Sequence, residues 1–289
     1  MAFTSASFIV LTIASVLLYY IVPKKAQWCI LLLASAAFYM AGSVKAFAWV
    51  VLVSGMTWVT GLILGRYNAI KPADKAQKAQ IQHKKKQIAI ICAVCCFGLL
   101  YAMKYWNFTL ELLPSALGNH IPRWDFVVPL GLSFFIFQSM SYVIDVYREE
   151  VEPQRKFVNL LLYASLFHQC IAGPIVRYQL VADEIENRKV KMDELYKGIK
   201  RFTIGLAKKA ILANGCATVA DTLVPTLASD IAEIPAAGLW IGMLFYALQI
   251  YLDFSAYSDM AIGMGLMVGF HYDENFNYPY ISGSIKEFW

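Results

Sequence analysis

Long apolar blocks alternate with short charged stretches along the whole chain, and this alternation constrains the fold more than any single motif. Only 16% of the 289 residues are charged and 59% are hydrophobic, whereas a typical soluble domain is about 25% charged. A membrane-crossing helix needs roughly 20 mostly apolar residues, and only helices or closed barrels satisfy the backbone inside lipid. The sequence therefore predicts an all-α fold, a polytopic transmembrane helical bundle.

We predict that residues 1–289 form a single membrane-embedded domain. The charged stretches set the boundaries of the helices, because a crossing needs an uninterrupted apolar run. The predicted spans are residues 5–22, 27–42, 45–65, 88–105, 126–146 and 237–257. Three further segments are short, broken or charged in their interior, and there we predict re-entrant or interfacial helices, at residues 157–174, 202–222 and 258–271.

Basic residues gather between the apolar blocks and indicate how the chain is oriented. Residues 66–87 are rich in lysine, and residues 23–25 read Pro-Lys-Lys. By the positive-inside rule both stretches are cytoplasmic, which places residues 106–125 outside. This orientation explains the net charge of +5. We therefore expect a multi-pass protein of the cell (inner) membrane, with the lipid bilayer as its partner and no nucleic acid.

The apolar segment 250–270 carries two acids, Asp253 and Asp259, together with four hydroxyl residues, Tyr251, Ser255, Tyr257 and Ser258. A carboxylate at bilayer depth costs roughly 2.5–3.5 kcal/mol. At i,i+4 spacing, Ser255 shares a helix face with Asp259, and Asp253 shares one with Tyr257. One interpretation is structural, with hydroxyls and nearby cations that only cap the acids. We favour the alternative, in which the two acids line a polar cavity inside the bundle.

The same segment contains small residues at four-residue intervals. Ala261, Gly265 and Gly269 would form one ridge on a helix. Such small-xxx-small ridges let a neighbouring helix approach closely in a membrane. We predict that this ridge is the packing surface of the segment.

Other polar residues in apolar blocks are weaker candidates. Gln138 lies too deep in its block to reach the surface, so we include it among the cavity-lining residues. Asp145 and Arg148 are expected to pair with each other at the cytoplasmic end. His168 is a weak candidate for a catalytic base, because a lone histidine among apolar neighbours is usually hydrogen-bonded and inert. No metal or bound cofactor is predicted, since the C-x-x-C from Cys92 has no partner ligands near it.

Four blocks, in order, carry a family resemblance. They read "VPLGLSFFIFQSMSYVIDVYR", "IAGPIVRY", "YALQIYLDFSAYSDMAIGMGLMVGF" and "ENFNYPYISGSIKEFW". Together they resemble the membrane-bound O-acyltransferase family, and within it the bacterial alginate O-acetyltransferase group. The resemblance runs from about residue 126 to the end, and the N-terminal spans are similar to the family in number and basic spacing.

The resemblance implies a bundle pierced by a polar tunnel, and it places Asp253, Ser255, Tyr257, Ser258 and Asp259 around that tunnel. It implies transfer of an acyl group from acetyl-CoA or an acyl-carrier thioester to hydroxyls of an extracytoplasmic polysaccharide, with an extracytoplasmic acyltransferase partner protein. The family's essential histidine follows the "EFW" motif and is therefore expected beyond Trp289, so residues 1–289 are expected to be an N-terminal part that is inactive alone. A transporter or flippase, or a scaffold subunit of a polysaccharide complex, is the alternative.

Overall fold

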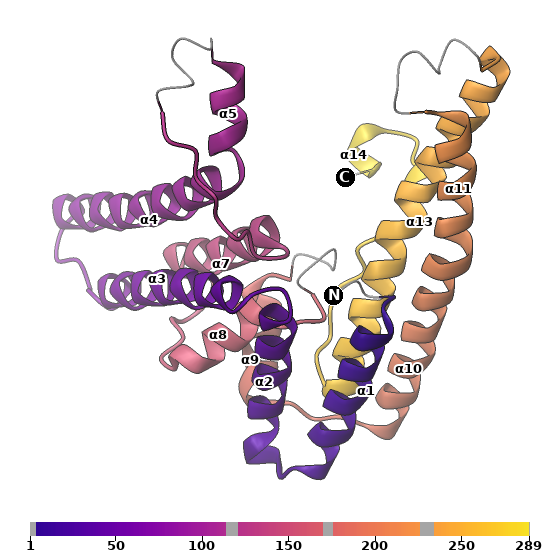
Figure 1. Cartoon of the computed structure of the whole chain (residues 1–289). Helices are drawn as coiled ribbons and strands as arrows, with labels where there is room; N and C mark the ends of the chain where they lie inside the picture. The colour runs from indigo at the N-terminus through magenta and orange to yellow at the C-terminus, as the bar shows by residue number, and fades with distance from the viewer. Residues whose placement is uncertain (1–3, 114–120, 170–175, 226–233, 289) are drawn as a thin grey trace. The chain divides into compact units, whose positions relative to one another are not determined.

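A computed structural model describes residues 4–113, 121–169, 176–225 and 234–288, and every regular element in these ranges is helical (Figure 1). The contacts divide the chain into two compact units. Among the described residues, unit 1 holds 14–169 and 176–187, and unit 2 holds 4–13 and 188–288. Each unit is packed internally, and the single domain predicted from the sequence stays a prediction.

Unit 1 is a set of helices packed around α3 and α7. Ser43 caps the start of α3 by accepting a hydrogen bond from the Lys45 amide, and Asp74 caps α4 through the Gln77 amide. Helix α3 packs against α4, α7 and α8, and α7 also contacts α9. The helices are α2 (Gln27–Met40), α3 (Val44–Asn68), α4 (Lys75–Lys104), α5 (Trp106–Leu112), α7 (Leu132–Tyr147), α8 (Phe157–Ser165) and α9 (Tyr178–Asn187), preceded by the 3-10 turn η1 (Lys24–Ala26). Helix α1 (Ala6–Ile21) begins in unit 2 and ends in unit 1.

Unit 2 is built on one long helix, α13 (Ala236–Val268), with a second helical run beside it (Figure 1). That run is continuous from α10 (Met192–Ala207) through the π-helical turn η2 (Lys208–Ala213) to α11 (Asn214–Leu223), and all three pack on α13. A loop after α13 contains the 3-10 turn η3 (Pro279–Ile281) and leads to α14 (Ile285–Phe288).

Glycines set the distance between α10 and α13. A Cβ added at Gly263 would lie 2.7 Å from the Phe202 backbone nitrogen and 2.8 Å from the Gly198 backbone oxygen. The predicted ridge of Ala261, Gly265 and Gly269 is therefore not the surface that meets α10. Gly265 packs on the Tyr272 ring, and Gly269 ends the helix with a φ of 83°.

Three helices in the described ranges, α3, α4 and α13, are long and apolar enough to cross a membrane. Helices α1 and α7 are apolar but have only 16 residues each, or roughly 24 Å at 1.5 Å per residue, against a hydrocarbon core of about 30 Å. Three of the six predicted spans, at residues 45–65, 88–105 and 237–257, therefore lie in helices that are long enough to cross a membrane. Residues 126–131 precede α7 without forming helix, and the left-handed Gly131 marks its start.

Several predicted boundaries were wrong for identifiable reasons. The predicted break near residue 257 is absent, because no proline interrupts α13 before its glycine cap. The basic segment 66–87 is helical from Lys75, where Asp74 supplies a cap. The segment predicted at 202–222 starts earlier, at Met192, in one run that lasts to Leu223. In the segment predicted at 157–174, regular helix ends at Ser165, and residues 170–174 lie outside the described residues.

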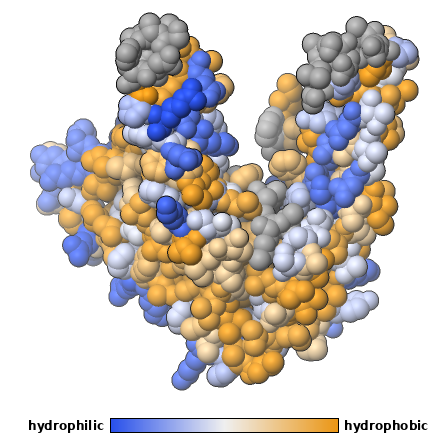
Figure 2. All heavy atoms as spheres, in the orientation of Figure 1, coloured by the Kyte–Doolittle hydropathy of each residue, from blue (hydrophilic) through white to orange (hydrophobic). Residues whose placement is uncertain are grey.

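Hydrophobic residues cover much of the visible surface (Figure 2). On α3 and α4 the exposed side chains include Leu52, Val59, Ile90 and Val94. Soluble proteins rarely expose apolar patches of this extent. The exposed apolar faces therefore agree with a protein whose solvent is lipid.

Candidate functional site

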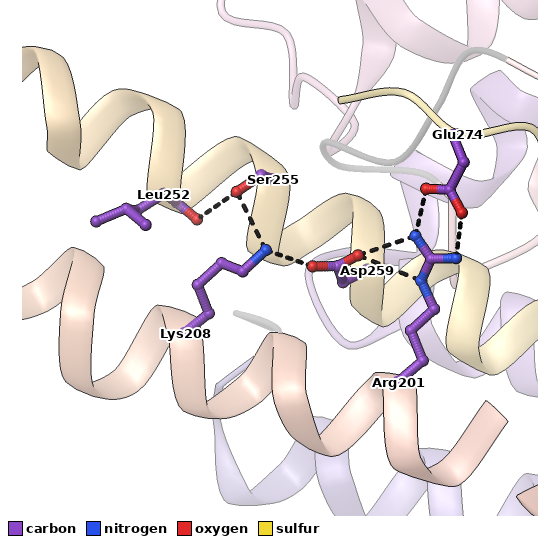
Figure 3. A network of polar contacts seen from close by, with 6 residues as sticks. All are labelled: Arg201, Lys208, Leu252, Ser255, Asp259 and Glu274. Atoms are coloured by element: carbon purple, nitrogen blue, oxygen red, sulfur yellow. Dashed lines mark hydrogen bonds and ion pairs between the residues drawn. The ribbon is translucent and has the colours of Figure 1, made fainter. Parts of the chain in front are cut away.

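Helix α13 positions the acids of the candidate site. Ser255 and Asp259 lie one turn apart, and the Lys208 ammonium reaches both, at 3.4 Å from Ser255 Oγ and 2.5 Å from Asp259 Oδ2 (Figure 3). This contact confirms the prediction that the two residues share a face. Ser255 Oγ also donates to the Leu252 carbonyl, which ties its hydroxyl to the helix itself.

Asp259 is held by two cations from the neighbouring run. Arg201 Nε and Nη2 donate to Asp259 Oδ1 at 3.2 and 3.0 Å, while Lys208 takes Oδ2. The Asp259 side chain is 20% exposed. Both of its oxygens are thus paired, which offsets the penalty of placing a carboxylate in an apolar helix.

Arg201 also binds Glu274, from the loop that follows α13. Its Nη1 and Nη2 donate to the two Glu274 oxygens at 2.5 Å each, as a bidentate pair (Figure 3). The hydrogen bonds from Arg201 lower the pKa of the Glu274 carboxyl below its ordinary value. The order along the site is therefore Lys208, Asp259, Arg201, Glu274, with alternating charge.

A second ion pair lies beside this chain of charges. Lys209 Nζ is 2.6 Å from Asp253 Oδ1 and 5.7 Å from the centre of the Tyr257 ring. Gln249 Nε2 donates to Asp253 Oδ2 at 3.3 Å. Asp253 and Tyr257, which the i,i+4 spacing places on one face, thus both lie beside the same lysine. These contacts hold Asp253 in place from both sides.

The π-helical turn starts at the two lysines. Lys208 and Lys209 both reach acids on α13, although consecutive side chains on a regular helix diverge by about 100°. π-Helical turns are rare in proteins, and those that do occur are frequently found at functional sites. The local widening of the helix coincides with the point where two adjacent cations meet Asp253 and Asp259.

The four linked charges of Lys208, Asp259, Arg201 and Glu274 border a cavity of about 650 Å³. Ser258 lies in its wall, is 3% exposed, and its Oγ has no hydrogen-bond partner among the described residues. Pockets for small ligands have volumes of about 300–1,000 Å³. We call this cavity the polar pocket; its lining residues are Arg201, Lys208, Tyr251, Ser255, Ser258, Asp259, Glu274, Phe276, Asn277 and Tyr278.

The polar pocket offers hydrogen bonds, paired charges and aromatic rings. None of the described residues that line it is a histidine or a cysteine, and both of its carboxylates are engaged by cations. In the described part of the chain, no group of three or more His, Cys, Asp or Glu side chains is arranged to hold a metal ion. The pocket is therefore suited to binding and orienting a polar ligand.

Gln138 belongs to unit 1, in a buried network of neutral groups. Its Nε2 donates to the Tyr163 carbonyl at 3.0 Å. The Tyr163 hydroxyl donates to the Val176 carbonyl at 2.7 Å and lies 3.4 Å from Ser141 Oγ. Its contacts with the described residues are those of a structural residue, and Gln138 is not among the described residues that line the polar pocket, so its prediction as a cavity-lining residue stays a prediction.

The predicted pair of Asp145 with Arg148 does not form. Asp145 instead pairs with Arg177, at 3.1 Å, and Arg148 lies 3.9 Å from Glu150. The i,i+3 prediction was wrong because packing α9 against α7 brings a better-placed cation to the buried acid.

The expectations for a catalytic base concern His168 and a histidine beyond Trp289. His168 is 1% exposed and packs edge-on against the Phe167 ring, with 5.3 Å between the ring centres. It belongs to unit 1, whereas the polar pocket is lined by unit 2. Trp289 lies outside the described residues, so the expectation that the family's histidine follows it stays a prediction. Neither expectation places a histidine in the polar pocket.

The four charged partners of the predicted acids and their neighbours were not identified from the sequence: Arg201, Lys208, Lys209 and Glu274. The aromatic and amide residues of the pocket wall, Tyr251, Phe276, Asn277 and Tyr278, were not identified as site residues either. The available signal was the pair of lysines inside an apolar run, which was noted only as an obstacle to crossing. Two cations in one apolar helix and two acids in another are best explained as partners, because each unpaired charge would be costly.

The fold and this site define the class of protein. The family model of the membrane-bound O-acyltransferase family matches residues 31–289, and the chain belongs to that family.

Individual relatives are similar over most or all of the chain. A probable alginate O-acetylase of Azotobacter vinelandii is 35% identical over 100% of this chain and 56% of its own length. The peptidoglycan O-acetyltransferase of Helicobacter pylori is 29% identical over 90% of this chain and 51% of its own length. The teichoic acid D-alanyltransferase of Bacillus subtilis is 29% identical over 66% of this chain and 47% of its own length. The chain thus spans about half the length of these relatives.

Proposed function

We propose that this protein is a membrane O-acyltransferase that acylates hydroxyls of an extracytoplasmic envelope polymer. Family membership supports acyl transfer. The relatives are named for O-acetylation of alginate, O-acetylation of peptidoglycan and D-alanylation of teichoic acid. Their shared element is an acyl group placed on an envelope polymer, and the two O-acetyl relatives favour acetyl as that group.

One observation carries the proposal on the structural side. A helical unit with an exposed apolar surface contains a cavity bordered by Arg201, Lys208, Asp259 and Glu274. Ionisable groups in apolar helices mark substrate pathways by default. We assign Ser255, Ser258 and Asp259 to the wall of the substrate route, and Asp253 and Tyr257 to the adjoining face held by Lys209.

Acyl transfer to a hydroxyl requires a base within about 2.6–3.2 Å of that hydroxyl. Asp259 and Glu274 are ill-suited to this task, because each is held by a cation. We therefore propose that the polar pocket binds and orients a substrate rather than moving the proton. The base is proposed to be a histidine beyond Trp289, and His168, buried in unit 1, stays a weak candidate for that role.

The remaining parts of the proposal concern substrates, partners and placement. The donor is acetyl-CoA or an acyl-carrier thioester on the cytoplasmic side, and the acceptor is a polysaccharide outside. A partner acyltransferase outside the cell membrane takes part in the transfer of the acyl group to the polysaccharide. The protein crosses the cell membrane several times, with residues 66–87 in the cytoplasm because of their lysines.

The function is tested in cells that lack the chromosomal gene. Ester-linked acetyl on the isolated envelope polysaccharide is quantified by NMR before and after complementation with the natural gene or its Asp259→Asn variant. We expect acetyl to disappear in the deletion strain, return with the natural gene and stay absent with the variant. Polymer that is fully acetylated but retained inside the deletion strain would instead identify a transporter. Normal acetylation and normal export would exclude both functions.

Orientation is tested separately with a single cysteine at Gln80, which is exposed on α4. In a background without other cysteines, a membrane-impermeant maleimide should label this position only after the cells are opened. Labelling in intact cells would reverse the proposed topology.

A further inference from the structure

Arg201 binds two carboxylates through different edges of its guanidinium group. The inner edge, Nε and Nη2, contacts Asp259, and the outer edge, Nη1 and Nη2, contacts Glu274 (Figure 3). Asp259 is 20% exposed and shared with Lys208, whereas Glu274 is 61% exposed and contributed by a loop. Asp259 is therefore the fixed partner of Arg201, and Glu274 is the replaceable one.

We propose that the outer edge of Arg201 is the binding site for a carboxylate or phosphate group of a substrate, which displaces Glu274 when it enters the polar pocket. The proposal rests on the proposed function only in taking the ligand to be a substrate. A guanidinium fork matches both kinds of oxyanion through two parallel hydrogen bonds.

The charges of the pocket fit this exchange. Arg201 and Lys208 carry two positive charges, and Asp259 carries one negative charge, so these three leave one positive charge for an anion. Glu274 supplies that anion from within the chain. An incoming oxyanion that replaces Glu274 keeps the charge balance, so the pocket never holds an uncompensated cation.

Ser258 gives an independent sign that the pocket accommodates a ligand. Its side chain is 3% exposed in the wall of the cavity, and its Oγ has no hydrogen-bond partner among the described residues. A buried hydroxyl without a hydrogen-bond partner is destabilising, because it has lost its hydrogen bonds to water. A polar ligand anchored on Arg201 can supply the missing hydrogen bond.

Displaced Glu274 has space to move into, and its loop has other anchors. Glu274 also lines a second cavity of about 570 Å³, which is bordered by the rest of the loop and by α14. The Tyr280 hydroxyl donates to the Ala247 carbonyl at 3.0 Å, and the Phe276 and Tyr280 rings pack on Tyr251. The loop therefore stays on α13 when the Arg201–Glu274 contact opens.

The test measures ligand affinity in the purified natural protein in detergent, by isothermal titration calorimetry. The first anionic probe is coenzyme A, and pantetheine, which carries no phosphate, is its neutral counterpart. The second anionic probe is glucuronate, and glucose is its neutral counterpart. The variants are Glu274→Gln, Arg201→Lys and Arg201→Gln. Asp221→Asn is the control, because Asp221 is an exposed acid of unit 2 that lines neither the polar pocket nor the second cavity.

We expect Glu274→Gln to tighten binding of at least one anionic probe about fivefold, since removing an exposed competing charge is worth up to about this factor. Binding of the neutral counterparts to Glu274→Gln, and binding of all four probes to Asp221→Asn, should not change. Arg201→Lys should weaken binding of that probe, and Arg201→Gln should abolish it. Tighter binding of coenzyme A alone would show that the bound anionic group belongs to the acyl donor. Tighter binding of glucuronate alone would show that it belongs to the acceptor.

Unchanged or weaker binding of both anionic probes by Glu274→Gln, in protein that still binds them, would show that Glu274 is only a loop tether and would overturn the proposal. No detectable binding of either anionic probe to the natural protein and to Glu274→Gln would overturn it equally. Failure of the proposed function is a different result: acetyl on the polysaccharide would then be independent of the gene, whatever the calorimetry shows.

Discussion

Both units bury polar side chains in apolar surroundings, but they do so in different ways. In unit 1, Gln138, Ser141 and Tyr163 are neutral and satisfy one another or backbone carbonyls. Unit 1 also buries two ions, Lys85 and Asp145, and each is paired with an opposite charge. In unit 2, partly exposed ions on α10, η2, α13 and the following loop form one connected network that borders a cavity. Neutral groups and isolated ion pairs can be enclosed when every group has a partner, whereas a network of several ions is tolerated where a wet pocket adjoins it.

We propose from this difference that the polar groups of unit 1 serve packing and those of unit 2 serve binding. Tyr163 is wholly buried, and its hydroxyl donates to a backbone carbonyl, so it acts only as a neutral hydrogen-bonding group. Arg201 and Glu274 retain access to solvent, at 27% and 61% exposure. Variants in the two units should therefore fail differently, in stability for unit 1 and in activity for unit 2.

The largest effect is expected at Asp259. Replacing it with Ala leaves Arg201 and Lys208 without their shared partner, and we expect polysaccharide acetylation to fall at least about 100-fold with protein still present in the membrane. Asp253→Ala, which removes only the partner of Lys209, should retain more activity. Acetyl content per unit of membrane protein is the measurement. Near-normal acetylation in both variants would contradict the expectation that variants in unit 2 fail in activity.

The next effect concerns the contact between α10 and α13. In Gly198→Ala, the new Cβ would lie 2.7 Å from the Gly263 backbone oxygen, and we expect destabilisation of about 1–3 kcal/mol from overpacking. Gly215→Ala on α11 is the control, because nothing lies within 4 Å of a Cβ there, and Ala favours helix by about 1 kcal/mol. Thermal unfolding in detergent should rank Gly215→Ala, the natural protein and Gly198→Ala in falling order. Equal stability of the two variants would contradict the close approach of the helices.

A smaller effect is expected from Tyr163→Phe in unit 1. The change removes a hydroxyl that donates to the Val176 carbonyl and contacts Ser141, and it should destabilise the protein by about 1–2 kcal/mol. Acetylation per folded molecule should stay near normal. The measurements are thermal unfolding and acetyl content of the same preparation. Loss of acetylation in a variant of unchanged thermal stability would show that unit 1 contributes to activity and not only to packing.

The smallest effect is the coupling between Lys209 and Asp253. We expect Lys209→Met and Asp253→Asn each to destabilise the protein, and the double variant to be less destabilised than the sum of both by about 0.5–1 kcal/mol. A double-mutant cycle on unfolding free energies measures this coupling. Strict additivity would mean that the 2.6 Å contact contributes nothing to stability.

Much of the site was predictable at the level of one helix. Ser255 with Asp259, and Asp253 with Tyr257, share faces because the helical period fixes which residues are neighbours. The partners of these residues were not predictable in the same way. Asp145 shows why: its local partner Arg148 is three residues away, but the cation it contacts is Arg177, which is 32 residues away.

The sequence by itself determined the all-helical fold, the apolar blocks, the family and the faces of α13 that carry the acids, because these follow from local period, composition and motif order. The tertiary structure decided that α13 runs unbroken, that Gly198 and Gly263 set its distance from α10, and that Arg201, Lys208, Lys209 and Glu274 neutralise its acids. The physical reason is that ion pairs between helices depend on the register in which backbones pack, and that register is a property of both surfaces together.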